Sequence, residues 1–223
     1  MTTHSNVSDS LLDPAAYDAW YHTARGRWIG DREFNLLRKL LFPKSGESLL
    51  DIGCGTGYFS RRFARLGLSA TGIDPDSKAI EFAKGEEAGN ITYLQGNALS
   101  LPFPSNSFDY TIAITSLCFI DDPLQALQEM WRVTDRSLVL GLLNRQSLLY
   151  LQKYRHGSYR HARWNTANEV RERWMPLLTP APKEFSIRTA IFFPQGGGVA
   201  RWAEEWIPKW IPLGGFLAVF LEK

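Results

Sequence analysis

The chain has 223 residues, which is enough for one full α/β domain and too few for two of ordinary size. Hydrophobic residues make up 44% and charged residues 22%, as in ordinary globular proteins, and the net charge of +2 argues against nucleic acid as a partner. Cys54 and Cys118 form no Cys-x-x-Cys pair, so we expect neither a disulfide framework nor a zinc site, and a reducing, cytoplasmic setting.

The sequence gives no sign of a signal peptide or a membrane span. Residues 1–10 are polar and contain neither a basic nor an apolar segment, so a secretory signal is not expected. The longest apolar run, residues 112–120, is interrupted by Thr115 and Ser116. It is far shorter than the ~20 residues that span a bilayer.

Two helices are predicted before the first strand. Asp13-Pro14 is a typical helix start, and it opens a helix up to residue 22 with aromatic residues at 17, 20 and 21. Arg25-Gly26 is expected to break this helix, and a second one is expected over 32–42 before Pro43. The aromatic residues of the first helix are suited either to core packing or to a ligand site.

A glycine-rich turn follows the first strand. Residues 48–50 are apolar and end at Asp51, and apolar residues at 59, 63 and 66 recur at helical spacing. Between strand and helix lie three glycines, at positions 53, 55 and 57. Glycines let a ligand approach the backbone closely, and a helix N-terminus presents free N–H groups. The dinucleotide fingerprint requires a further glycine where this chain has Tyr58, which weakens an NAD-type interpretation.

Asp74 ends the second predicted strand, residues 69–74. In a right-handed βαβ unit its carboxylate lies beside the glycine turn, where it can accept both hydroxyls of a ribose. The alternative is that Asp74 caps the next helix, residues 77–84, although Asp76 serves that purpose as well.

The next two strands are predicted over 91–95 and 108–114. The second is a near-continuous apolar run, as in a central parallel strand, so the residues that follow it face the same crevice as the glycine turn. Asp122-Pro123 opens another helix, and residues 137–143 form a fifth strand.

The pattern changes after the fifth strand. A basic, aromatic insertion and a helix over 166–178 are expected to cap the crevice, and a solvated basic face or a partner surface is an equal alternative. A helix over 199–210 carries three tryptophans at intervals of four, which we expect in the core. Strands over 184–193 and 216–221 complete the chain.

The stretch Asp51-x-Gly53-x-Gly55-x-Gly57 resembles motif I of the class I S-adenosylmethionine-dependent methyltransferases. Residues 96–103 resemble the family segment that encloses the adenine, although relatives usually carry Asp in place of Asn97. The motifs cover about residues 45–144 and look most similar to the small-molecule branch that includes ubiquinone and menaquinone methyltransferases.

This resemblance implies an α/β fold with a Rossmann-like, doubly wound, seven-stranded sheet whose last strand is antiparallel. It implies a single domain over 1–223, with an N-terminal helical lid (1–43), a cofactor-binding core (45–144), a cap insertion (145–180) and C-terminal strands (184–223). The implied function is transfer of a methyl group from S-adenosyl-L-methionine to a small-molecule acceptor by in-line displacement, by a monomer or homodimer.

The residues expected to bind the cofactor follow from the matched segments, together with Thr115 after the fourth strand and two residues near the first helix that could meet the methionine carboxylate. They are Asp51, Gly53, Cys54, Gly55, Thr56, Gly57, Asp74, Pro75, Asn97, Ala98, Leu99, Thr115, Tyr21 and Arg25. The aromatic faces of Tyr17, Trp20 or Tyr21 are suited to the sulfonium.

No metal and no obligatory catalytic residue are expected. If the acceptor must lose a proton, His22, His156 and His161 are the candidate bases. Two other functions stay open, a non-catalytic S-adenosylmethionine sensor and an NAD-linked oxidoreductase. A nucleic-acid substrate is disfavoured, because residues 115–118 read Thr-Ser-Leu-Cys instead of the Asn/Asp-Pro-Pro-aromatic tetrad of amino-methylating enzymes.

Overall fold

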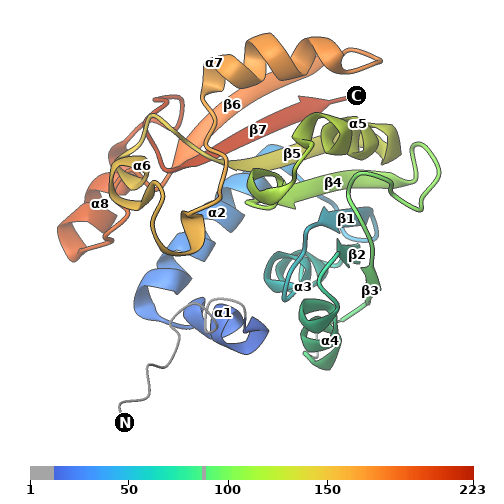
Figure 1. Cartoon of the computed structure of the whole chain (residues 1–223), viewed down its shortest axis with the longest axis horizontal. Coiled ribbons are helices and arrows are strands. Elements are labelled where there is room, and N and C mark those ends of the chain that lie inside the picture. Colours follow the sequence, from blue (N-terminus) through green and yellow to red (C-terminus); the bar gives the residue numbers. More distant parts are fainter. Residues whose placement is uncertain (1–12, 87–88) are drawn as a thin grey trace.

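The fold is built on one mixed sheet of seven strands in the order β3-β2-β1-β4-β5-β7-β6 (Figure 1). The computed structural model describes residues 13–86 and 89–223, so the expected polar N-terminus lies outside the described residues. The strands are β1 (Ser48–Ile52), β2 (Ser69–Asp74), β3 (Ile91–Gln95), β4 (Phe108–Ile114), β5 (Thr134–Leu143), β6 (Glu184–Ala190) and β7 (Phe216–Glu222). The first five pair in parallel, and β7 runs antiparallel to β5 and β6, which confirms the predicted sheet.

Helices pack on both faces of this sheet. Leu49 of β1 belongs to the core shared with α2 (Ala24–Leu41) and α3 (Tyr58–Ala64), whereas Leu50 and Ile52 belong to the core shared with α5 (Pro123–Val133). Successive side chains of a strand point to opposite faces, so the apolar run of a central parallel strand fills both cores. The other helices are α1 (Pro14–Trp20), α4 (Ser77–Gly85), α6 (Leu148–Lys153), α7 (Ala167–Glu169) and α8 (Gly198–Trp206).

Helix α2 corrects one sequence prediction. It begins at Ala24 and not at residue 32, with the Thr23 hydroxyl accepting a hydrogen bond from the Gly26 N–H at 3.0 Å, so the Arg25-Gly26 pair that was expected to lie between two helices is part of α2. A Cβ on Gly26 would lie 2.0 Å from the Trp20 carbonyl oxygen, and one on Gly30 would lie 2.5 Å from the Tyr58 hydroxyl. These glycines therefore permit close packing against neighbouring elements and do not end the helix.

The three tryptophans that were expected in the core are instead exposed. Helix α8 ends at Trp206, and the side chains of Trp202, Trp206 and Trp210 are 65%, 74% and 71% exposed. The regular spacing correctly places Trp202 and Trp206 on one helix face, but that face does not pack against the sheet.

The predicted cap insertion divides into two parts. Residues 166–178 are irregular: α7 is followed by a wider π turn over 170–174 and a 3₁₀ turn over 175–177. Val170, Trp174 and Leu178 are buried in the same core as α5. Figure 1 shows α7 beside β6, so this part covers the sheet and not the crevice. Only the preceding part, residues 145–165, lies near the crevice.

None of the helices in the described ranges is long and apolar enough to cross a membrane.

Candidate active site

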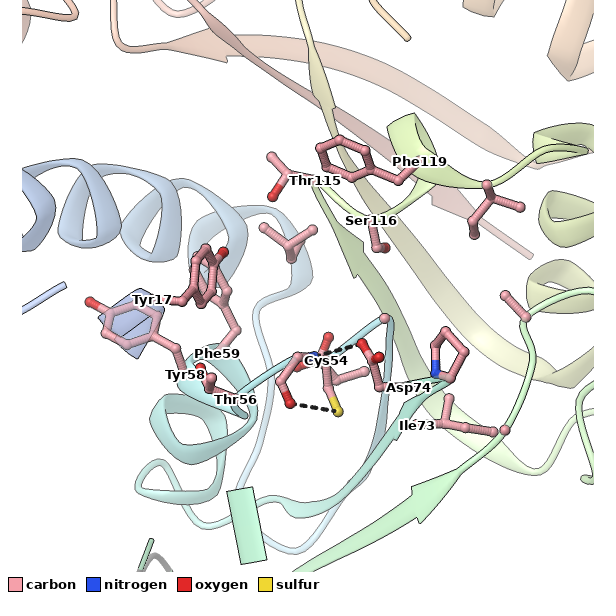
Figure 2. Close-up of a pocket in the computed structure, with 18 of the residues that line it drawn as sticks. Tyr17, Cys54, Thr56, Tyr58, Phe59, Ile73, Asp74, Thr115, Ser116 and Phe119 are labelled. Atoms are coloured by element: carbon pink, nitrogen blue, oxygen red, sulfur yellow. Dashed lines mark hydrogen bonds between the residues drawn. The ribbon is translucent and has the colours of Figure 1, made fainter. Parts of the chain in front are cut away.

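The carboxyl ends of β1, β2 and β4 meet around a cavity of about 360 Å³. The glycine turn, Asp74 and residues 114–116 line it, together with the tyrosines of α1 and its C-cap. Figure 2 shows Tyr17 and Tyr58 on one side of this first cavity, Thr115 and Phe119 on another, and Cys54 and Asp74 on a third. Parallel strands that end at one edge create such a crevice, which is the usual ligand position in open α/β sheets.

The glycine turn is packed tightly on one side and open on the other. Gly53 has φ 69°, and a Cβ there would lie 2.3 Å from the Cβ of Ser116, whose hydroxyl donates to the Ile52 carbonyl at 2.7 Å. Gly55 also has positive φ, but a Cβ added there would meet no atom within 4 Å. The turn therefore presents bare backbone to the first cavity.

Two carboxyl groups lie in this cavity. Asp51 is 2% exposed and accepts a hydrogen bond from the Ser60 hydroxyl at 2.6 Å, and burial raises the pKa of its carboxyl to about 7. Asp74 accepts from the backbone N–H groups of Gly55 at 2.8 Å and of Asp76 at 2.9 Å, and burial raises its pKa as well. Asp76, not Asp74, caps α4, since its side chain accepts from the Lys78 N–H.

Helix α1 is fastened over the glycine turn by a buried ion pair. The Arg61 guanidinium of α3 donates to Asp18 at 2.6 Å and to the Thr56 carbonyl at 2.5 Å, so it joins α1, the turn and α3. Next to this pair the rings of Tyr21 and Tyr58 stack at 3.7 Å between centroids, with 11° between their planes. The tyrosine that replaces the fingerprint glycine therefore positions α1.

A second cavity, of about 390 Å³, adjoins the first. The two share the wall residues Tyr17, Tyr21, Thr115 and Phe119. The rest of the second cavity is formed by α1, α2, the 145–165 segment and the start of β7, and its lining is mostly apolar and aromatic. Glu33 supplies its buried carboxyl.

The structure brings most of the predicted site residues together. Those that line the first cavity are Tyr21, Asp51, Gly53, Cys54, Gly55, Thr56, Asp74, Pro75, Asn97, Ala98 and Thr115. Gly57 and Leu99 belong to the same turns but do not line it: Gly57 is the N-cap of α3, and the Leu99 N–H donates to the Asn97 side chain at 2.9 Å. Arg25 faces the second cavity, and its Nε donates to the Pro194 carbonyl at 2.8 Å.

Several lining residues were missed by the sequence analysis. Phe59, Ile73 and Ile120 adjoin the matched motifs in sequence, so their proximity along the chain was the available signal, whereas Ser116 follows the fourth strand and was expected to face the crevice. Glu33 has no such signal. The three candidate histidines line neither cavity, and in the described ranges no group of three or more His, Cys, Asp or Glu side chains is placed to hold a metal ion.

The comparisons with known proteins agree with this geometry. Residues 50–137 match a family model described as a methyltransferase domain. A Mycobacterium tuberculosis protein described as uncharacterized is 36% identical over 217 residues, which cover 93% of this chain and 71% of that protein. A demethylmenaquinone methyltransferase of Listeria welshimeri is 36% identical over 102 residues, 43% of each chain.

The similarity extends to a solved structure from Thermotoga maritima, an S-adenosylmethionine-dependent methyltransferase described as a possible histamine N-methyltransferase. It superimposes with a TM-score of 0.75 at 25% identity, over 96% of this chain and 97% of that one. The motif turn, the sheet order and these similarities lead to one conclusion: the chain belongs to the class I S-adenosylmethionine-dependent methyltransferases.

Proposed function

We propose that the first cavity binds S-adenosylmethionine, that the second binds a small-molecule acceptor, and that the methyl group passes between them. The observation that carries this assignment is the shared wall of Tyr17, Tyr21, Thr115 and Phe119. A methyl transfer needs donor and acceptor atoms about 3–3.5 Å apart and in line, which requires two binding spaces in direct contact.

The residues of the first cavity fit this cofactor. Asp74 is suited to the ribose hydroxyls, because a carboxylate oxygen that accepts one backbone N–H retains capacity for another donor. The Thr56 hydroxyl is buried and has no hydrogen-bond partner among the described residues, so a ligand atom can satisfy it. The Asp51 carboxyl, when ionised, is favourable to a cofactor that carries a cationic sulfonium and an amine.

When bound, this cofactor supplies an electrophilic methyl group on a sulfonium that is already a good leaving group. The work of the chain is therefore binding, orientation and exclusion of water. Tyr17 and Tyr21 present aromatic rings at the shared wall, where they are suited to a neighbouring cation and keep water out. The Arg61–Asp18 pair holds these rings in place.

The second cavity favours a compact, largely apolar acceptor. Its walls include Ile29, Leu149 and Phe216, and apolar walls with a few polar groups are typical of small-molecule sites. The likeness to a demethylmenaquinone methyltransferase supports an acceptor of the aromatic or quinone type. The predicted monomer or homodimer and the cytoplasmic setting stay predictions.

Calorimetry on the Asp74→Ala variant tests the cofactor assignment. We expect its affinity for S-adenosylmethionine to fall by at least about 10-fold, because a charged hydrogen-bonding group is worth about 1.5–3 kcal/mol. Asp76→Ala is the matched control: it removes a carboxyl two residues away that caps α4, and its affinity should stay within a few-fold of the wild type. Equal affinity of Asp74→Ala and wild type would refute the ribose assignment.

A further inference from the structure

Glu33 is the exception among the buried carboxyl groups of the described residues. Asp18 pairs with Arg61, Asp51 accepts from the Ser60 hydroxyl, and Glu204 accepts from the N–H groups of residues 191 and 192 at 2.7 and 2.8 Å. Glu33 is 9% exposed, and among the described residues burial alone shifts the pKa of its carboxyl, with no hydrogen bond or neighbouring charge contributing.

A carboxyl group buried without a partner destabilises the fold, so its retention calls for an explanation. Glu33 lies on α2 and lines the second cavity, so the missing partner can arrive as a ligand. The same cavity shares its wall with the proposed cofactor space, which places this carboxyl on the acceptor side of the reaction.

The surroundings of Glu33 limit what that ligand can be. The other titratable groups that line the cavity are Tyr17 and Tyr21 from the α1 segment, Arg25 from α2, Lys153 from α6, and Tyr159 from the 157–159 turn. Arg25 is engaged by the Pro194 carbonyl, and burial is the cause that raises the pKa of Glu33, with no neighbouring cation offsetting it. Apart from Thr115 and Ser158, the remaining wall residues are apolar. A largely apolar molecule with one hydrogen-bond donor is therefore complementary to the cavity.

We propose that Glu33 is the acceptor-binding residue and proton acceptor of the second cavity, and that the methyl acceptor donates a hydroxyl or amino hydrogen to it. This inference rests on the proposed function. The acceptor oxygen or nitrogen uses its lone pair to form the new bond to the methyl carbon. The carbon–sulfur bond breaks, and its electron pair stays on sulfur. The proton of the acceptor O–H or N–H moves to a Glu33 carboxylate oxygen.

The acidity of Glu33 suits this role. Burial raises its pKa to about 8, and a general base is most effective when its pKa lies near the working pH. The carboxylate form increases as pH rises, so turnover should increase as pH rises through about 8. The histidines that the sequence offered as bases lie outside both cavities.

The test uses the full chain and the variant Glu33→Gln, which keeps the shape of the side chain but cannot accept the proton. The probes are 2-naphthol and 2-naphthylmethylamine, with 2-methoxynaphthalene as a matched aromatic that has no donor. Binding is measured by calorimetry with S-adenosylhomocysteine present, and turnover by S-adenosylhomocysteine formed from S-adenosylmethionine. Glu205→Gln is the control, because that carboxylate is 61% exposed and pairs with Arg32 of α2, the helix that carries Glu33.

We expect the wild type and Glu205→Gln to bind at least one donor probe more tightly than the methoxy compound. Glu33→Gln should lose that preference. Its kcat should fall by about 10²-fold or more, and its pH profile should lose the step near pH 8 and keep only the rise that deprotonation of the probe itself causes at higher pH. Comparison of 2-naphthol with 2-naphthylmethylamine shows whether the site binds a hydroxyl or an amino donor.

Three results would overturn the proposal: no donor probe binds the wild type, Glu33→Gln keeps the preference for donors, or its pH profile equals that of the wild type. S-adenosylmethionine binding is measured on every variant. If the wild type binds no cofactor, the proposed function itself fails, whereas normal cofactor binding with unchanged turnover in Glu33→Gln refutes the role of Glu33 alone. Normal S-adenosylmethionine binding by Glu33→Gln shows that this variant is folded, and Glu33→Asp, which keeps the acid, should retain the pH dependence.

Discussion

At the scale of single residues, backbone conformation marks the point where the two cavities meet. Thr115 has φ 51°, an uncommon left-handed conformation for a β-branched residue, and its N–H donates to the Gly141 carbonyl at 2.8 Å. Such conformations cost free energy and persist where the surroundings impose them, often at binding sites. Thr115 lines both cavities, so the strained residue lies at the proposed transfer point.

Gly53 offers a test of the glycine turn. In Gly53→Ala the new Cβ would overlap the Ser116 side chain in a backbone conformation that alanine rarely adopts, so we expect a loss of about 1–3 kcal/mol in the free energy of unfolding. Affinity for S-adenosylmethionine should fall with it, as measured by calorimetry. Gly85→Ala is the control, because its Cβ meets no atom within 4 Å and it should be neutral or stabilising. A Gly53→Ala protein as stable as Gly85→Ala would contradict the packing argument.

Sequence reasoning at this scale succeeds where function follows a local motif. Asp51, Asp74 and Asn97 end or follow neighbouring strands, so chain order alone places them at one edge of the sheet. Glu33 could not be found in this way. An acidic residue within an amphipathic helix is usually solvated, and its burial depends on residues 143–216, which lie far away in sequence.

At the scale of elements, α1 depends on one buried ion pair. In Asp18→Asn the Arg61 guanidinium keeps its charge without a counter-charge in a buried position, so we expect a loss of about 3–5 kcal/mol in the free energy of unfolding. Replacing both partners with apolar residues, as in Asp18→Leu with Arg61→Met, should recover much of that loss. Urea denaturation measures both. If Asp18→Asn were as stable as the double variant, the ion pair would not be what fastens α1.

The elements that were predicted correctly are those whose signal is local. The bounds of β3 and β4 follow from short strand-like runs between turns, and the start of α5 follows from its Asp-Pro signal. Helix α2 and the tryptophans of α8 were misread because their environment is set by other elements. The glycines of α2 accommodate Trp20 and Tyr58, and no periodicity indicates which face of α8 lacks a partner.

At the scale of the whole molecule, cofactor and acceptor spaces come from different parts of the chain. The family match spans residues 50–137, which supply most of the first cavity. The second cavity is built mainly from residues before and after that span, in α1, α2, the 145–165 segment and β7. This division explains why the motifs identify the methyl donor while the acceptor depends on segments that the family match does not include.

The buried acids also predict how the stability of the ligand-free protein depends on pH. Burial raises the pKa of Glu33 to about 8 and that of Asp51 to about 7, whereas both are about 4 in an unfolded chain. Between these values the folded state binds more protons than the unfolded state, so the free energy of unfolding falls as pH rises. Each carboxyl contributes a slope of up to about 1.4 kcal/mol per pH unit.

Urea denaturation at pH values from about 5 to 8.5 measures this dependence. The wild type should lose stability steadily over the range. Glu33→Gln should show a shallower slope up to about pH 8, the pH at which Glu33 loses its proton in the folded protein. Asp51→Asn should flatten the curve only up to about pH 7. Arg132 holds the pKa of Glu129 below its usual value, so Glu129 titrates at more acidic pH and does not contribute to the slope in this range. Parallel curves for wild type and Glu33→Gln would mean that this carboxyl ionises in contact with water, and the second cavity would then lack the buried acid on which its proposed chemistry depends.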